Sequence, residues 1–288
     1  MPITVTNLTC VYGAGTPFET AALRDVSVTV ENGSFVGILG RTGCGKSTLI
    51  QIMAGLLTPT AGTVMLDGQD IHARRYDRSI LRRKVGIVFQ YPECQLFETT
   101  VEKDVAFGLK HSGLSAAEKH ARVRWALETV GFSFEKVHDQ PPMGLSGGEK
   151  RRVAIAGVLA MRPQCIVLDE ATAMLDPIGR SEVISTIERL NRDEGITVVL
   201  ITHHMNEAEH ADRVIVMNEG RVAMDGAPRE VFAQVEKLKS IGLTVPDTVE
   251  LLYELRGAGC DLPLTAITVD ECADAIARCF GKSAKEDN

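Results

Sequence analysis

The sequence contains no apolar run that is long enough to cross a membrane. Its longest apolar segments, such as residues 153–161 and 196–201, fall far short of the roughly 18 residues that a spanning helix needs. Residues 1–5 lack the charged start and the apolar stretch of a secretory signal. We therefore expect a soluble chain whose contact with any membrane is peripheral.

Cysteine pairs at metal-binding spacing are also missing. The seven cysteines are odd in number and scattered, and none belongs to a CxxC pair, which argues against a zinc knuckle or a thioredoxin-like motif. Cys272 and Cys279 share one predicted helix face, which favours buried small apolar residues. This usage fits a reducing, cytosolic compartment.

Positive charge is not in excess. The 288 residues include 31 Lys and Arg against 38 Asp and Glu, a formal net charge of −7. This balance argues against a protein that holds nucleic acid by bulk electrostatics. The basic cluster before residue 85 is interpreted as a solvated face; it comprises Arg74, Arg75, Arg78, Arg82, Arg83 and Lys84.

What the sequence does contain is a P-loop. Residues 40–47 (GRTGCGKS) fit the pattern GxxxxGK[ST] between a short apolar strand at 34–39 and helical spacing at 46–56. The glycines let backbone N–H groups face phosphate oxygens, while Lys46 places a charge on the β- and γ-phosphates and Ser47 offers a hydroxyl to Mg²⁺. The predicted nucleotide-binding residues here are Gly40, Arg41, Thr42, Gly43, Cys44, Gly45, Lys46, Ser47 and Thr48.

Two further segments accompany the P-loop. An apolar run ends in Asp169 and Glu170, so both carboxylates should emerge at the carboxyl edge of a sheet, where ligands bind. We predict that Asp169 holds Mg²⁺ and that Glu170 orients and deprotonates the attacking water. Residues 145–149 (LSGGE) open a helix whose N-terminus can take an anion. The basic residues 150–152 either contact phosphate or form a solvated face, and the solvated face is the favoured interpretation.

The order of elements predicts an α/β protein. Period-two alternation in the first forty residues indicates a β-hairpin start, and strands then alternate with helices as in a mostly parallel sheet. We predict a nucleotide-binding domain over residues 1–226, with a helical subdomain at about 91–161, and a C-terminal helical domain over 227–288. The C-terminal helices are expected at 228–240, 247–256 and 269–280.

The P-loop, the Asp169–Glu170 pair and the LSGGE segment together resemble the ATP-binding-cassette ATPases. In that family the LSGGQ-type signature binds the ATP that a partner subunit holds. The resemblance implies the P-loop NTPase cassette fold, with a mixed sheet, an inserted helical subdomain and a small C-terminal helical domain. It also implies ATP and Mg²⁺ as ligands, two half-sites on each chain, and a dimer as the working unit.

Other residues match functional positions of this family. His203 resembles the switch histidine that contacts the γ-phosphate, and Gln90 resembles the Q-loop glutamine that touches Mg²⁺. The adjacent His204 could pair with it on a metal, but no third ligand is evident. The implied catalytic residues are Glu170 and His203, and the implied metal ligands are Ser47, Gln90 and Asp169. The implied signature and interface residues are Ser146, Gly147, Gly148 and Asp176.

Tyr12 is the candidate for stacking on adenine. It stands 28 residues before Gly40, where the family places an aromatic ring. Stacking tolerates any ring, so Phe18 is a rival, and ordinary sheet packing is the alternative for Tyr12.

Residues 90–108 indicate one subgroup within this family. The string QYPECQLFE, followed by TVEKDVAFG, is similar to the segment after the Q-loop of energy-coupling-factor transporter ATPases, which drive vitamin and metal-ion uptake. Residues 169–177 are similar to the same group. Ala171 and Met174 depart from the broader family, where proline and glycine are usual, yet both occur within this group.

This resemblance implies an ATP-hydrolysing subunit that powers uptake of vitamins or other micronutrients. Its implied partners are a second cassette ATPase (a paralogue or a second copy), a transmembrane coupling protein and a substrate-capturing membrane subunit, at the cytoplasmic face of the cell membrane. The alternatives are the ATPase of a cobalt/nickel-type or other ABC transporter and a soluble cassette ATPase acting on nucleic acid. The acidic charge and the single cassette disfavour the second of these, so no nucleic acid is expected.

Overall fold

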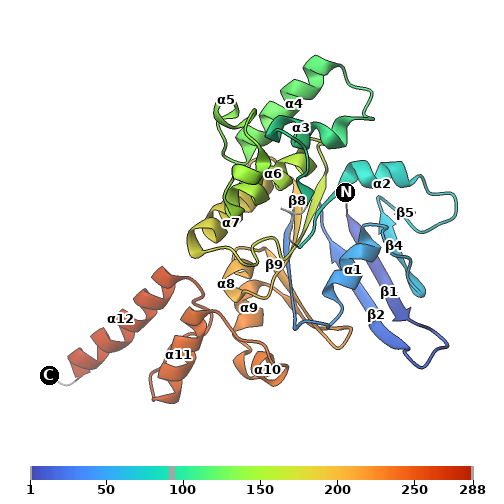
Figure 1. Ribbon diagram of the computed structural model, residues 1–288. Helices are drawn as coiled ribbons and strands as arrows, with labels where there is room; N and C mark the ends of the chain where they lie inside the picture. Colours follow the sequence, from blue (N-terminus) through green and yellow to red (C-terminus); the bar gives the residue numbers. More distant parts are fainter. Residues whose placement is uncertain (1, 91–94, 287–288) are drawn as a thin grey trace.

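Two β-sheets with helices around them make up the chain (Figure 1). The computed structural model describes residues 2–90 and 95–286. An antiparallel sheet has the order β2–β1–β4–β5 and a larger sheet has the order β10–β9–β3–β8–β7–β6. The first contains β1 (Ile3–Tyr12), β2 (Thr20–Val30), β4 (Ala61–Leu66) and β5 (Gln69–Asp70). The second contains β3 (Phe35–Leu39), β6 (Val85–Val88), β7 (Cys165–Asp169), β8 (Thr197–Ile201), β9 (Arg213–Asn218) and β10 (Arg221–Gly226).

The larger sheet is mixed and brings three functional segments to one edge. Its strands β6, β7, β8, β3 and β9 are parallel, and only β10 runs antiparallel, against β9. In the central strand β8, Ile201 pairs with Ile38 of β3 on one side and with Asp169 of β7 on the other. The chain leaving each of these strands therefore emerges at the same carboxyl edge, where α/β sheets bind their ligands.

The helices between β6 and β7 form a bundle at one end of the sheet, at the top of Figure 1. The helices before the C-terminal segment are α1 (Lys46–Met53), α2 (Arg78–Lys84), α3 (Val101–Ala106), α4 (Ala116–Thr129), α5 (Phe134–Val137), α6 (Gly147–Leu159), α7 (Pro177–Arg192) and α8 (Met205–Ala208). Apolar residues of this bundle and of the large sheet belong to one continuous core, which fixes the bundle on the sheet. Residues 91–94 of the predicted helical subdomain lie outside the described residues.

In two segments the helices differ from those that the sequence pattern indicated. The basic cluster carries a helix, α2, which the sequence pattern did not indicate; Asp77 caps it by accepting a hydrogen bond from Ser79 N at 2.8 Å. In the C-terminal segment, the single helix expected at 228–240 is two helices, because the backbone at Gln234 leaves the helical region. The C-terminal helices are α9 (Pro228–Phe232), α10 (Val235–Ser240), α11 (Asp247–Gly257) and α12 (Val269–Glu286).

The C-terminal helices divide between two apolar clusters. Phe232 and Leu238 belong to the main core, whereas Leu252 of α11 and Cys272 of α12 belong to a small cluster of their own. The division into domains at residue 226 stays a prediction. Among the residues described, no helix combines the length and the apolar character needed to cross a membrane.

An ion pair ties α9 to α12 and gives a pH-dependent stability. Arg229 Nη2 and Nη1 donate to the two carboxylate oxygens of Glu271 at 2.6 and 2.9 Å. This guanidinium lowers the pKa of Glu271 from 4.5 to about 2. Because the folded-state pKa is below the unfolded value, the stabilisation is complete above about pH 4.5 and is lost as the pH falls toward 2.

We therefore expect Glu271→Gln to destabilise the chain near neutral pH by about 1 kcal/mol, a value reduced for solvent screening because both side chains are partly exposed. The measurement is thermal unfolding of both proteins between pH 7 and pH 3. The difference in melting temperature should shrink as the pH falls; a difference that stays constant over this range would contradict the prediction.

Candidate nucleotide-binding and catalytic site

The P-loop joins β3 to α1, and two of its glycines are required by space. A Cβ on Gly40 would lie 2.5 Å from the Met217 carbonyl oxygen, and one on Gly45 would lie 2.4 Å from the Ala22 carbonyl oxygen. Both glycines also have positive φ angles, 152° and 105°, which L side chains rarely adopt. Only glycine therefore allows the loop to approach its neighbours this closely.

The loop closes around the Lys46 ammonium. This side chain is 6% exposed, and its Nζ donates to the carbonyl oxygens of Gly40 at 2.6 Å and Arg41 at 3.1 Å. Cys44 is buried as well, and its N–H donates to the Arg41 carbonyl oxygen at 3.2 Å. These contacts hold the ammonium inside the loop, where the backbone N–H groups of an anion-binding loop also converge.

A cavity of about 380 Å³ opens over the P-loop. It is lined by Tyr12, Ala22, Thr42, Gly43, Gly45, Lys46, Ser47, Thr48, Gln90 and Glu170. The Tyr12 ring is 43% exposed and its hydroxyl lies 3.3 Å from Thr48 Oγ1, whereas Phe18 is 85% exposed and lies outside the cavity. Of the two rings considered for adenine, only Tyr12 is therefore placed beside the P-loop.

The two carboxylates after β7 have different surroundings. Asp169 is 8% exposed and accepts a hydrogen bond from the Ser47 hydroxyl; burial raises its pKa, which that hydrogen bond partly offsets. Glu170 faces the cavity, where its Oε2 accepts a hydrogen bond from Gln90 Nε2 at 2.8 Å. Its φ of 49° is positive, and such strain is typical of residues that the surrounding structure holds in place for function.

His203 lies at the same carboxyl edge of the large sheet as Glu170. Its Nδ1 lies 3.8 Å from Glu170 Oε1 and its side chain is 51% exposed. The neighbouring His204 ring lies against it, with centroids 4.1 Å apart, but turns its Nδ1 toward Arg180 Nη1 at 3.5 Å. Burial lowers the pKa of His204, so the two histidines occupy different environments and only His203 faces Glu170.

A second cavity, of about 460 Å³, adjoins the first on the His203 side. The two share Thr42 and Glu170. Gly242, Leu243 and Thr244, which follow α10, line this second cavity together with Arg41, although they lie more than 200 positions after it in the sequence. The Arg41 side chain packs so closely on Gly242 that an added Cβ would lie 3.0 Å from its Cδ. The C-terminal segment therefore reaches the nucleotide site.

The signature residues lie elsewhere. Ser146 caps α6 in a capping box: its Oγ accepts from Glu149 N at 3.3 Å, and the Glu149 carboxylate accepts from Ser146 N at 2.9 Å. Gly147 is exposed and Gly148 is packed on Gly179 of α7. Within the described residues, none of 145–149 lines either cavity at the P-loop. The helix end that can take an anion is therefore displaced from this chain's own nucleotide cavity.

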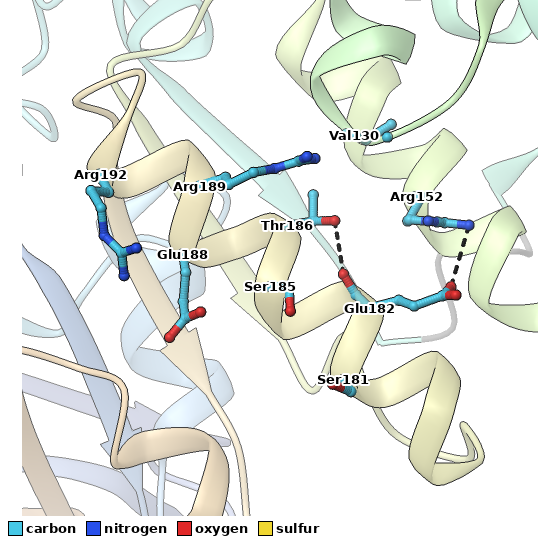
Figure 2. A pocket seen from close by; sticks show the side chains of 10 residues that line it. Val130, Arg152, Ser181, Glu182, Ser185, Thr186, Glu188, Arg189 and Arg192 are labelled. Atoms are coloured by element: carbon cyan, nitrogen blue, oxygen red, sulfur yellow. Dashed lines mark hydrogen bonds and ion pairs between the residues drawn. The ribbon is translucent and has the colours of Figure 1, made fainter.

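Two of the three basic residues that follow the signature, Arg151 and Arg152, are not part of a solvated face. Arg151 is 2% exposed and donates to the carbonyl oxygens of Ala171 and Ala173. Figure 2 shows Arg152 at the edge of a hollow of about 410 Å³ between α6 and α7, where its Nη2 pairs with Glu182 Oε2 at 3.3 Å. That part of the prediction is wrong, because both guanidinium groups hold α6 against its neighbours.

The predicted interface loop joins Glu170 to α7. Asp176 caps α7 by accepting a hydrogen bond from Gly179 N at 2.9 Å. Before it, Met174 has a positive φ of 63° and is 83% exposed. An apolar side chain held outward in this conformation is available for contact with another protein surface.

Three features of the site were missed by the sequence analysis. They are the contacts of Ala22, of Arg151 and of residues 242–244, each of which joins distant segments. For Arg151 a signal existed, because the four residues 153–156 that follow the basic triplet are all apolar and indicate a buried helix. Ala22 and residues 242–244 carry no local pattern.

Comparisons with known proteins show the family of the chain. The family model described as ABC transporter matches residues 23–173. The energy-coupling factor transporter ATP-binding protein EcfA2 of Symbiobacterium thermophilum is 51% identical over 277 residues, covering 96% of this chain and 96% of that protein. EcfA1 of Caldanaerobacter subterraneus subsp. tengcongensis is 49% identical over 272 residues, covering 94% of this chain and 97% of that protein.

Solved structures show the same fold. The structure of cbiO1 from Clostridium perfringens, part of the ABC transporter complex cbiONQ, has a TM-score of 0.74 at 40% identity, covering 83% of this chain and 93% of that one. A dimeric post-hydrolysis state of the ATP-binding cassette MJ0796, bound to ADP and Pi, has a TM-score of 0.68 at 30% identity, covering 78% and 98%. The predicted cassette fold is confirmed.

The two relatives cover almost the entire chain and are identical to it at about half of the aligned positions. Together with the family model, they confirm the predicted ATP-binding, transport-coupled ATPase. The chain belongs to the ABC transporter family and, within it, to the energy-coupling factor transporter ATP-binding proteins.

Proposed function

We propose that this chain powers the uptake of vitamins or other micronutrients as one half of an ATPase dimer. The proposal rests on one observation: the cavity at the P-loop and the signature residues lie apart in this chain. The cavity at the P-loop holds Lys46, Glu170 and Gln90, while the signature residues lie outside it. A second ATPase subunit, a paralogue or another copy, would supply the missing signature; the similar cassette MJ0796 is dimeric with bound ADP.

Each residue at the sheet edge has a separate role in ATP binding or hydrolysis. Lys46 and the P-loop N–H groups bind the phosphates, and Tyr12 stacks on adenine. Glu170, held by Gln90, takes a proton from the attacking water. His203 stands on the other side of Glu170, where it contacts the γ-phosphate. Ser146, Gly147, Gly148 and Asp176 act across the dimer interface.

Mg²⁺ fits the donor atoms that surround Asp169. Ser47, Gln90 and Asp169 supply hydroxyl, amide and carboxylate oxygens, and Ser47 already contacts Asp169; these are the ligand types that Mg²⁺ prefers alongside phosphate and water. When bound, the ion would neutralise negative charge on the phosphate oxygens.

A groove between α2 and the helical bundle is the proposed docking site of the transmembrane coupling protein. It has a volume of about 660 Å³ and is lined by residues of α2 and of the segments 108–114 and 161–164. Its lining combines apolar side chains with a basic rim: Leu109, Leu114 and Met161 with Arg82, Arg83, Lys84 and Arg122. An apolar anchor on a cytoplasmic helix would fit between these side chains, as in helix-in-groove recognition. Binding there would place the chain at the cytoplasmic face of the cell membrane.

Leu114→Asp should lower recovery of the coupling protein with this chain about tenfold, because it replaces an apolar contact for the anchor with a carboxylate that binding would desolvate. The chain is purified from its native membranes in mild detergent and the accompanying proteins are identified. Leu251→Asp, at an exposed apolar residue of α11, is the matched control. ATP binding should be unchanged in both variants.

The same purification tests the function itself. Recovery with a second cassette ATPase, a transmembrane coupling protein and small substrate-capturing subunits would support micronutrient uptake. Recovery alone, or with ribosomes or DNA, would contradict it and leave only the ATPase.

A further inference from the structure

A buried carboxylate lies close to the sheet edge that carries Glu170 and His203, and none of the roles proposed above involves it. Glu207, in the short helix α8, is 3% exposed. Its Oε1 accepts a hydrogen bond from the Thr172 hydroxyl at 2.6 Å, and its Oε2 accepts one from the Thr202 hydroxyl at 2.5 Å. Arg180 Nε of α7 lies 3.5 Å from Oε1. A carboxylate is costly to bury, and here two hydroxyl donors and a nearby guanidinium compensate it.

The Thr202 contact ties Glu207 to the turn that carries His203. Thr202 Oγ1 accepts a hydrogen bond from His204 N at 3.0 Å while its own proton goes to Glu207. Glu207 N in turn donates to the His204 carbonyl oxygen at 3.2 Å. The turn 202–207 is thereby closed on the Glu207 carboxylate, with His203 projecting from it toward Glu170.

The Thr172 contact ties Glu207 to the segment after Glu170, and a second charged residue holds that segment as well. Arg151 of α6 donates to the carbonyl oxygens of Ala171 and Ala173, on either side of Thr172. The Arg151 guanidinium thus holds this segment through two carbonyl groups, and the Glu207 carboxylate holds it through the Thr172 hydroxyl. Thr172 itself is 1% exposed, so water does not replace either contact.

We propose that Arg151 and Glu207 are positioning residues that clamp residues 171–173 and thereby set Glu170 and His203 for hydrolysis. Glu170 has a positive φ, and a strained backbone persists only where its surroundings over-determine it. The clamp provides that restraint. Since Arg151 belongs to the signature helix, it also links the half-site that meets the partner's ATP to the catalytic residue of this chain's own ATP.

The inference rests on the proposed role of Glu170, and Thr172 offers the mildest test. Thr172→Val keeps the shape of the side chain but removes the proton donated to Glu207, whereas Thr172→Ser keeps the hydroxyl. In the full chain with its accompanying subunits, we expect Thr172→Val to lower kcat about tenfold with KM for ATP within about twofold, and Thr172→Ser to stay within about twofold of the wild type.

A role in packing alone gives a different pattern. If Thr172→Val and Thr172→Ser lowered kcat equally, or if Thr172→Val left kcat unchanged, the clamp would be refuted. Glu207→Gln, which retains one acceptor oxygen, should likewise lower kcat without changing KM, and an unchanged kcat would also refute the proposal. Glu170→Gln is measured in parallel: its inactivity together with normal Thr172→Val turnover refutes only the clamp, while its activity refutes the role of Glu170.

Discussion

Glu170→Gln should lower ATP turnover by about 10²-fold or more and leave ATP binding intact. Glutamine has the same shape as glutamate but cannot take a proton from water. Its side-chain oxygen can still accept the hydrogen bond that Gln90 Nε2 now donates at 2.8 Å, so the cavity should keep its form. The variant should therefore bind ATP, pair with its partner and stall before hydrolysis.

The measurement combines steady-state hydrolysis with nucleotide titration of the same preparation. Lys46→Ala is the contrasting variant, because removing the ammonium that lies inside the P-loop should weaken ATP binding itself. A Glu170→Gln protein that hydrolyses ATP at nearly the wild-type rate would show that another group is the general base.

Much of this site could be predicted because its parts are local patterns attached to strand ends. Residues 40–47 specify a glycine loop between a strand and a helix, and Asp169–Glu170 closes an apolar run. Parallel strands that end at one edge bring such segments together without any further information. The placement of His203 beside Glu170 follows from β7 and β8 being neighbours, which their shared hydrophobic character allows.

What could not be predicted depends on contacts that no short pattern records. Arg151 lies in a basic triplet; the apolar residues 153–156 after it indicate a buried helix, but they do not identify the two carbonyl groups of a distant loop to which this buried guanidinium donates. The contact of Arg41 with Gly242 joins segments 201 positions apart. Periodicity describes which face of an element is apolar, but it does not identify the polar partner that makes burial of a charge acceptable.

The second large effect is expected at the signature. In a dimer of two copies of this chain, Gly147→Asp should lower turnover by about 10²-fold or more, without weakening the ATP binding of the chain that carries it. Gly147 is exposed at the start of α6, and an added Cβ would meet only Leu175 Cδ2, at 3.5 Å. The variant should therefore fold, but its carboxylate would repel the partner's phosphate and compete for the helix N-terminus. Gly147→Ala, which adds the Cβ without the charge, is the matched control and should remain active.

Mixing two inactive variants tests the shared site directly. In a mixed dimer of Lys46→Ala and Gly147→Asp chains, the intact P-loop of the second faces the intact signature of the first, so one of the two sites is complete. If the chain pairs with itself, about half of the dimers in an equal mixture are mixed, and about a quarter of the wild-type turnover should return.

If its partner is a paralogue, turnover should stay absent in this mixture. In that case a Gly147→Asp chain should block hydrolysis at the paralogue's P-loop while its own P-loop still hydrolyses ATP against the paralogue's signature. Loss of hydrolysis only at the P-loop of the mutated chain itself would contradict a site shared between two subunits, whatever the partner.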